Sequence, residues 1–63
     1  MKYNELHKIL RENNCSLTGK QRAGHPEWYS PLTGRKFTTC NHGTKEVASG
    51  TLKSILRDAG IKA

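Results

Sequence analysis

The stretch at residues 25–39, "HPEWYSPLTGRKFTT", predicts the centre of the fold because two strand-forming segments flank a turn. Pro31 and Gly34 are typical turn residues, and residues 35–40 are rich in amino acids that favour β-structure. The stretch therefore predicts a strand, a hairpin turn and a second strand.

Trp28 defines the two faces of this hairpin, because successive side chains of a strand point to opposite sides of the sheet. If Trp28 points into the core, Pro26 and Ser30 share its side. In the second strand of the hairpin, two inward-facing sets remain open, Phe37 with Thr39 or Thr38 with Cys40. The residues expected on the solvent side of the first strand are His25, Glu27 and Tyr29.

The flanking segments predict two helices and a further strand. Residues 4–13 fit a helix capped by Asn4, and residues 15–22 alternate in part and fit a strand. A turn is expected at Ala23 and Gly24. The segment "TLKSILRDAG" has apolar residues at helical spacing, with Gly60 as its stop.

These elements predict a single α+β domain over residues 1–63 in the order α-β-β-β-α. Two helices would pack on one face of a three-stranded antiparallel sheet and leave the other face in water. The predicted core consists of Leu6, Ile9, Leu10, Leu17, Trp28, Leu52, Ile55 and Leu56.

The chain is small and strongly basic. Its 63 residues include eleven Lys and Arg against five Asp and Glu, which gives a formal net charge of +6 and an isoelectric point near 9.8. A chain this short leaves little room for a large substrate cavity. The charge favours a polyanionic partner, nucleic acid first, and the alternative is simply a well-solvated surface.

Several other classes of protein are not favoured. The N-terminus "MKYNELHKIL" lacks the apolar core of a signal peptide, and no stretch approaches the roughly 20 apolar residues of a membrane span. We therefore expect a cytoplasmic protein in which Cys15 and Cys40 are free thiols. Together with His25 and His42 they lack the paired close spacings of a zinc site, so no metal or other cofactor is expected.

The C-terminal part of the chain resembles a known family. The segment "GTLKSILRDAGI", residues 50–61, resembles the ending Gly-Thr-Leu-x-Ser-Ile-Leu-Lys-Gln-Ala-Gly-Leu of the HicA-type mRNA interferase toxins of bacteria. Upstream, "NHGTKEV" is similar to the family's His-containing segment before a Lys-Glu-Leu, and "ELHKILREN" resembles its first helix. The resemblance covers nearly the whole chain.

The resemblance implies a fold, a function and a partner. The fold is similar to that of double-stranded-RNA-binding domains, and the function is that of the toxin in a type II toxin–antitoxin system. The toxin would be an endoribonuclease that cleaves mRNA, and a HicB-type antitoxin would bind and inhibit it.

The resemblance also assigns the catalytic role to His25. The family's catalytic histidine follows a Gly-Ser pair at the start of the second strand and precedes an aromatic residue by three positions, which here is Trp28. Ala23 and Gly24 stand where Gly-Ser is usual, and Pro26 takes a commonly polar position. Pro26 biases His25 toward extended backbone and holds it at the start of the strand.

Histidine suits this reaction on chemical grounds as well. RNA cleavage requires a proton to leave the attacking 2′-hydroxyl and a proton to reach the departing 5′-oxygen, and an imidazole that titrates near neutrality serves either step. The alternative for any isolated histidine is a surface residue without a role, as expected for His7 on the first helix. His42, in the loop after the third strand, is the other candidate acid or base.

Five cations are predicted around the sheet, where they would bind RNA and stabilise charge that develops on the scissile phosphate. Solvation of the surface is the alternative for each of them. These residues are Lys20, Arg22, Arg35, Lys36 and Lys45.

Two other functions are compatible with the same pattern. One is a non-catalytic module that binds RNA through the same order of elements, and the other is a partner-binding protein with weakened or lost catalysis. Cleavage of RNA by the purified protein, compared with binding alone, distinguishes these alternatives.

Overall fold

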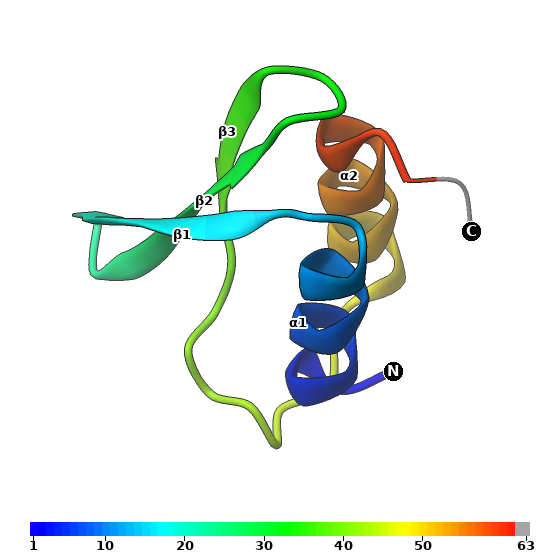
Figure 1. Ribbon diagram of the computed structural model, residues 1–63. Helices are drawn as coiled ribbons and strands as arrows, with labels where there is room; N and C mark the ends of the chain where they lie inside the picture. The colour runs from blue at the N-terminus through cyan, green and yellow to red at the C-terminus, as the bar shows by residue number, and fades with distance from the viewer. Residues whose placement is uncertain (62–63) are drawn as a thin grey trace.

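The chain folds into two layers, with both helices on one side of a three-stranded sheet (Figure 1). The computed structural model describes residues 1–61. Its elements are α1 (Tyr3–Glu12), β1 (Ser16–Arg22), β2 (His25–Ser30), β3 (Arg35–Thr38) and α2 (Ser49–Ala59). The strands are antiparallel in the order β1-β2-β3, so the predicted α-β-β-β-α fold is confirmed. Within residues 1–61, no helix is both long and apolar enough to span a bilayer.

Trp28 lies at the centre of the core, where only 1% of its surface is exposed. It stands between Leu17 of β1 and Phe37 of β3 in the strand register. Its indole N–H donates a hydrogen bond to Oγ1 of Thr39 at 3.0 Å, and the guanidinium of Arg11 lies 5.6 Å from the ring centre. Because a buried indole N–H without an acceptor is costly, Thr39 is what allows this ring to be fully buried.

The inward-facing residues after the hairpin turn are Phe37 and Thr39, both buried, while Thr38 and Cys40 are half-buried. Of the two inward-facing sets that the sequence left open, the structure therefore shows Phe37 with Thr39. The full set of buried apolar residues is Tyr3, Leu6, Leu10, Cys15, Trp28, Phe37, Val47, Ile55, Leu56 and Ala59.

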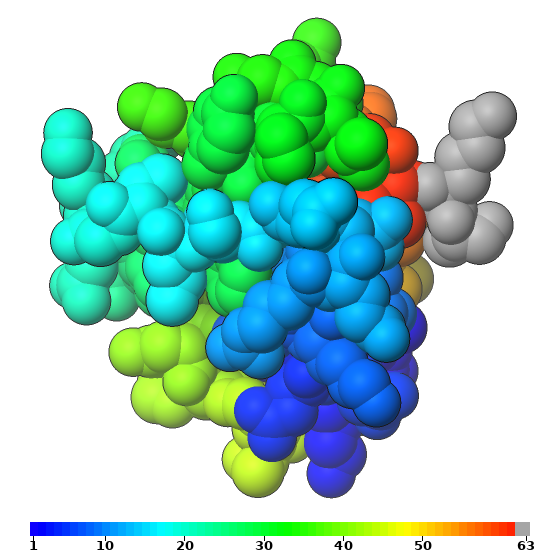
Figure 2. Space-filling model, in the orientation of Figure 1, coloured from blue at the N-terminus to red at the C-terminus, as the bar shows by residue number. Residues whose placement is uncertain are grey.

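The edge strand β1 departs from the predicted core. Leu17 was expected inside but is 53% exposed, and all seven residues of β1 are exposed. Helix α2 packs on β2 and β3, the two strands beyond β1 in the sheet. Figure 2 shows the side chains of β1, in cyan, spread over the surface. Ile9 and Leu52, also predicted inside, are half-buried.

The start of α1 is capped by backbone from a distant loop. The helix begins at Tyr3, and no side chain caps it, so the prediction of Asn4 as the N-cap is wrong. Instead, the amides of Tyr3 and Asn4 donate to the carbonyl oxygens of Lys45 and Gly43 at 3.1 and 2.9 Å. The loop at residues 39–48 thus satisfies amides that a helix leaves unpaired at its N-terminus.

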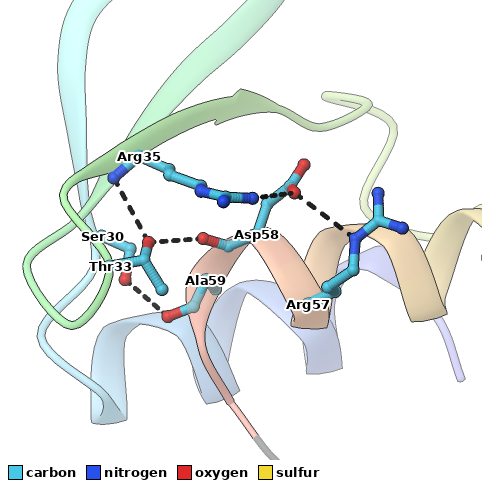
Figure 3. A network of polar contacts seen from close by, with 6 residues as sticks. All are labelled: Ser30, Thr33, Arg35, Arg57, Asp58 and Ala59. Carbon is cyan, nitrogen blue, oxygen red and sulfur yellow. Dashed lines mark hydrogen bonds and ion pairs between the residues drawn. The ribbon is translucent and has the colours of Figure 1, made fainter.

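The end of α2 is capped by the turn between β2 and β3 (Figure 3). Gly60 ends the helix in the left-handed conformation, with φ of 76°, as predicted. The hydroxyl of Ser30 donates to the carbonyl of Ala59, and that of Thr33 donates to the carbonyl of Asp58, both at 2.6 Å. These bonds fix the hairpin turn against the helix.

The core predicts a large difference between two substitutions at paired positions. Trp28→Ala should lower the free energy of unfolding by about 3–5 kcal/mol, because it removes the largest buried side chain and leaves a cavity. Leu17→Ala, at the exposed position directly opposite, should lower it by less than about 1 kcal/mol. Urea unfolding of both variants measures the difference. Equal stabilities of the two variants would contradict this account of the core.

Candidate functional site

His25 is the first residue of β2 and lies directly opposite Arg22, the last residue of β1. The two strands are joined by Ala23 and Gly24, whose φ angles are 51° and 80°. Two successive positive φ angles are typical of a type I′ turn, which matches the twist of the flanking strands. The predicted turn is therefore present, and it places His25 and Arg22 at paired positions of the two strands at the hairpin end.

Two adjoining hollows lie between β3 and α2. The larger, of about 480 Å³, is lined by Arg22 and Lys36 from the sheet and by residues of α2. The smaller, of about 180 Å³, is lined by His25 among others. Both are lined by Thr38, Thr51 and Ile55, so the two hollows adjoin, and we call them together the β3–α2 groove.

The larger hollow is lined largely by polar side chains, Asp58 among them, whereas the smaller hollow exposes more apolar than polar surface. Thr51 and Ser54 contribute hydroxyl groups from α2, and Thr38 contributes one from β3. Hydroxyl groups and cations are the groups with which proteins contact the phosphates and sugars of nucleic acids. His25 is exposed at the start of β2, and it lines the smaller of the two hollows.

The structure places Arg22 and Lys36 in the larger hollow, which adjoins the hollow lined by His25, and it places the other three predicted cations elsewhere. Lys20 is exposed on β1 and lines neither hollow. Lys45 is exposed in the loop at residues 39–48, where its carbonyl accepts the amide of Tyr3.

Arg35 belongs to the network at the end of α2 (Figure 3). One of its terminal nitrogens lies 3.7 Å from Oδ1 of Asp58, which Arg57 also approaches at 3.7 Å. The backbone amide of Arg35 donates to Oγ1 of Thr33 at 3.2 Å. The charge of Arg35 is therefore partly compensated, and its role in this fold is to join the hairpin turn to the helix.

Glu27 is a buried carboxylate of β2, next in sequence to the buried Trp28. It was predicted to point toward solvent, but only 7% of its side chain is exposed. Its Oε2 accepts from Nε of Arg22 and its Oε1 accepts from the hydroxyl of Thr18, both at 2.8 Å. These two hydrogen bonds, that from Arg22 first, hold the pKa of Glu27 below its usual value.

Sequence reasoning did not identify Glu27 as a candidate site residue. One signal was available in the composition of the strands. The three strands contain four Lys and Arg residues, and Glu27 is their only acidic residue. It also stands two positions after His25, on the same side of β2 by alternation.

His7 is a structural histidine, and the expectation that it is a surface residue is wrong. Its ring lies 5.3 Å from that of Trp28, and its Nε2 is 2.9 Å from Oγ1 of Thr39. Burial and the nearby charge of Arg11 lower the pKa of His7. His42, by contrast, is exposed in the loop at residues 39–48 and lines neither hollow.

Cys15 is buried and Cys40 is half-buried, and both are free thiols. Among residues 1–61, no three His, Cys, Asp or Glu side chains are grouped so that they could hold a metal ion.

The comparison with known protein families identifies the chain. A family described as "HicA toxin of bacterial toxin-antitoxin" matches residues 3–61, which include both helices and all three strands. The chain belongs to the HicA toxin family. Neither a curated protein nor a solved structure matches it.

Membership of the HicA family makes this chain a toxin of a bacterial toxin–antitoxin system. The predicted resemblance is thereby confirmed over almost the entire chain. The histidine that the resemblance selects, His25, is the one that lies in the β3–α2 groove beside a groove-lining arginine.

The turn that carries His25 predicts a stabilising substitution. Ala23 has a positive φ, which costs free energy for a residue with a Cβ, whereas Asn tolerates this conformation and favours type I′ turns. Ala23→Asn should therefore raise the free energy of unfolding by about 0.5–1 kcal/mol, or the melting temperature by roughly 2–8 °C. Thermal unfolding followed by circular dichroism measures the change.

Ala23→Val is the matched control, because a β-branched residue is disfavoured at positive φ. It should lower the melting temperature. If the Asn and Val variants have the same melting temperature, the backbone strain assigned to Ala23 is absent.

Proposed function

We propose that this HicA-family toxin is a metal-independent endoribonuclease that cleaves mRNA in the cytoplasm, with His25 as its general acid/base. The observation that carries the proposal is the position of His25, which lines the smaller hollow of the β3–α2 groove and lies directly opposite Arg22 in the strand register. Family membership supports RNA as the target of such a toxin.

His25 is suited to move the proton that starts the reaction. The neutral imidazole takes the proton from a ribose 2′-hydroxyl, whose oxygen forms a bond to the adjacent phosphorus. The bond from phosphorus to the 5′-oxygen then breaks, and the imidazolium returns the proton to that oxygen. The products are a 2′,3′-cyclic phosphate and a free 5′-hydroxyl, so the reaction consumes no cofactor.

Arg22 and Lys36 supply positive charge where the phosphate becomes more negative during the attack. Both line the larger hollow, which adjoins the hollow that contains His25. Donors fixed near a developing oxyanion lower the barrier more than they stabilise the substrate. In this proposal Lys20 and Lys45 attract RNA from a distance, and Arg35 contributes least because Asp58 compensates its charge.

The proposal predicts a selective loss of activity in His25→Ala. This variant should remain folded and bind RNA, and its cleavage rate should fall by about 10²–10⁴-fold, the usual contribution of a general acid or base. Cleavage of a labelled single-stranded RNA by purified protein measures the rate. The wild-type activity should persist in a chelator and should be absent on DNA of the same sequence, which lacks the 2′-hydroxyl.

His42→Ala is the matched control, because His42 is exposed outside the groove, and it should retain measurable activity. Full activity of His25→Ala, or equal cleavage of DNA and RNA, would contradict the mechanism. Tight RNA binding by a wild-type protein that cleaves nothing would instead identify a non-catalytic RNA-binding protein.

We also propose that the partner is a HicB-type antitoxin that covers the basic side of this toxin. The net charge of +6 and the position of Arg22 and Lys36 in one groove fit an acidic surface on that partner. Such a partner would occupy the same groups that bind RNA.

The proposed mode of inhibition predicts that antitoxin and RNA exclude each other. Addition of the cognate antitoxin should displace labelled RNA from the His25→Ala toxin, which binds without cleaving, and should stop cleavage by the wild-type toxin. Fluorescence anisotropy and gel analysis of the products measure the two effects. A stable complex that still binds and cleaves RNA would rule out occlusion.

A further inference from the structure

We infer that Glu27 is a positioning residue that holds the guanidinium of Arg22 in place to bind the RNA phosphate next to His25. The inference rests on the proposed function and adds to it a residue that does not touch the substrate. Three observations support it: the hydrogen bonds of Glu27, the ion pair that Arg22 forms through Nε, and the excess of positive charge in the three strands.

Glu27 is fixed on both of its oxygens. Thr18 on β1 donates to Oε1 and Arg22, also on β1, donates to Oε2, each at 2.8 Å. The carboxylate therefore links β2 to two positions of the edge strand. Between those two positions the register of β1 shifts, so the ladder alone does not fix the end of the strand.

The contact with Glu27 uses the part of Arg22 that RNA does not need. The carboxylate accepts from Nε, and in residues 1–61 this is the single ion pair of Arg22. The two terminal nitrogens of the guanidinium remain able to bind a phosphate as a fork. The side chain of Arg22 is 60% exposed, so the fork is accessible from solvent and from the groove that it lines.

The burial of Glu27 explains how a carboxylate is tolerated in a phosphate-binding sheet. Glu27 is the only acidic residue among the four cations of the strands, and an exposed carboxylate there would repel RNA. Only 7% of the Glu27 side chain is exposed, and its negative charge is compensated by the ion pair with Arg22. Because a long arginine side chain loses conformational freedom when it binds a ligand, holding it beforehand reduces that cost.

Three roles for Glu27 predict different effects of Glu27→Gln, which keeps the shape and removes the charge. If Glu27 only repelled RNA, the variant would bind and cleave RNA better. If Glu27 only stabilised the fold, the variant would melt earlier and cleave normally well below its melting temperature. If Glu27 positions Arg22, kcat falls although the protein has gained positive charge, and the fall depends on Arg22.

The test measures kcat and KM on a single-stranded RNA for the wild type, Glu27→Gln, Arg22→Ala and the double variant. Arg22→Ala should lower kcat/KM by about 10- to 100-fold, the value of a charged hydrogen bond. When Arg22 is present, Glu27→Gln should lower kcat by about three- to tenfold. In the Arg22→Ala background it should change kcat by less than about twofold, because the group it positions is gone.

Two further variants complete the design. Lys8→Ala removes one exposed positive charge on α1, outside both hollows, and should leave kcat unchanged. Thr18→Val removes the other hydrogen bond to Glu27 and should lower kcat in the same direction as Glu27→Gln, which keeps the test decisive if the Gln variant does not fold. Circular dichroism at the assay temperature establishes that each variant is folded.

The outcomes separate this inference from the function on which it rests. If cleavage depends on His25 but Glu27→Gln leaves kcat unchanged or raises it, the positioning role is wrong and the proposed function stands. The same holds if Glu27→Gln lowers kcat equally with and without Arg22. Absence of cleavage by the wild-type protein would overturn the proposed function, and the positioning role with it.

Discussion

The hydrogen bond from the indole of Trp28 to Thr39 is the interaction on which the rest of the structure depends. It joins the middle strand to the segment that follows β3, and Thr39 is also within hydrogen-bonding distance of His7 on α1. The amide of Thr39 donates in turn to the carbonyl of Pro26, one residue after His25. One buried residue, Thr39, therefore links α1, the start of β2 and the loop at residues 39–48.

The parts of the fold that follow from local patterns could be predicted from the sequence. Trp28 and the turn residues Pro31 and Gly34 indicated the hairpin, and Gly60 indicated the end of α2. The errors arose where tertiary contacts decide. Leu17 has the apolar character of a core residue, but its burial depends on how far the helical layer extends over the edge strand, and β1 is exposed along its length.

The candidate site was predictable in the same limited sense. The turn at Ala23 and Gly24 fixes His25 at the start of a strand, and antiparallel pairing then brings Arg22 opposite. The groove was not predictable, because it exists only where α2 packs beside β3. The burial of Glu27 depends on Thr18 reaching it across an irregular ladder, and alternation within β2 alone contains no information on that contact.

The exposed edge strand β1 has a consequence for the solubility of the toxin once its antitoxin is removed. An uncovered edge invites other chains to add to the sheet and so begin aggregation. In β1 the register shift around Gly19, whose φ is 85°, interrupts the ladder, and Lys20 and Arg22 place positive charges along it. Two copies of this edge would meet irregular backbone and like charges, which disfavours pairing of the sheet with itself.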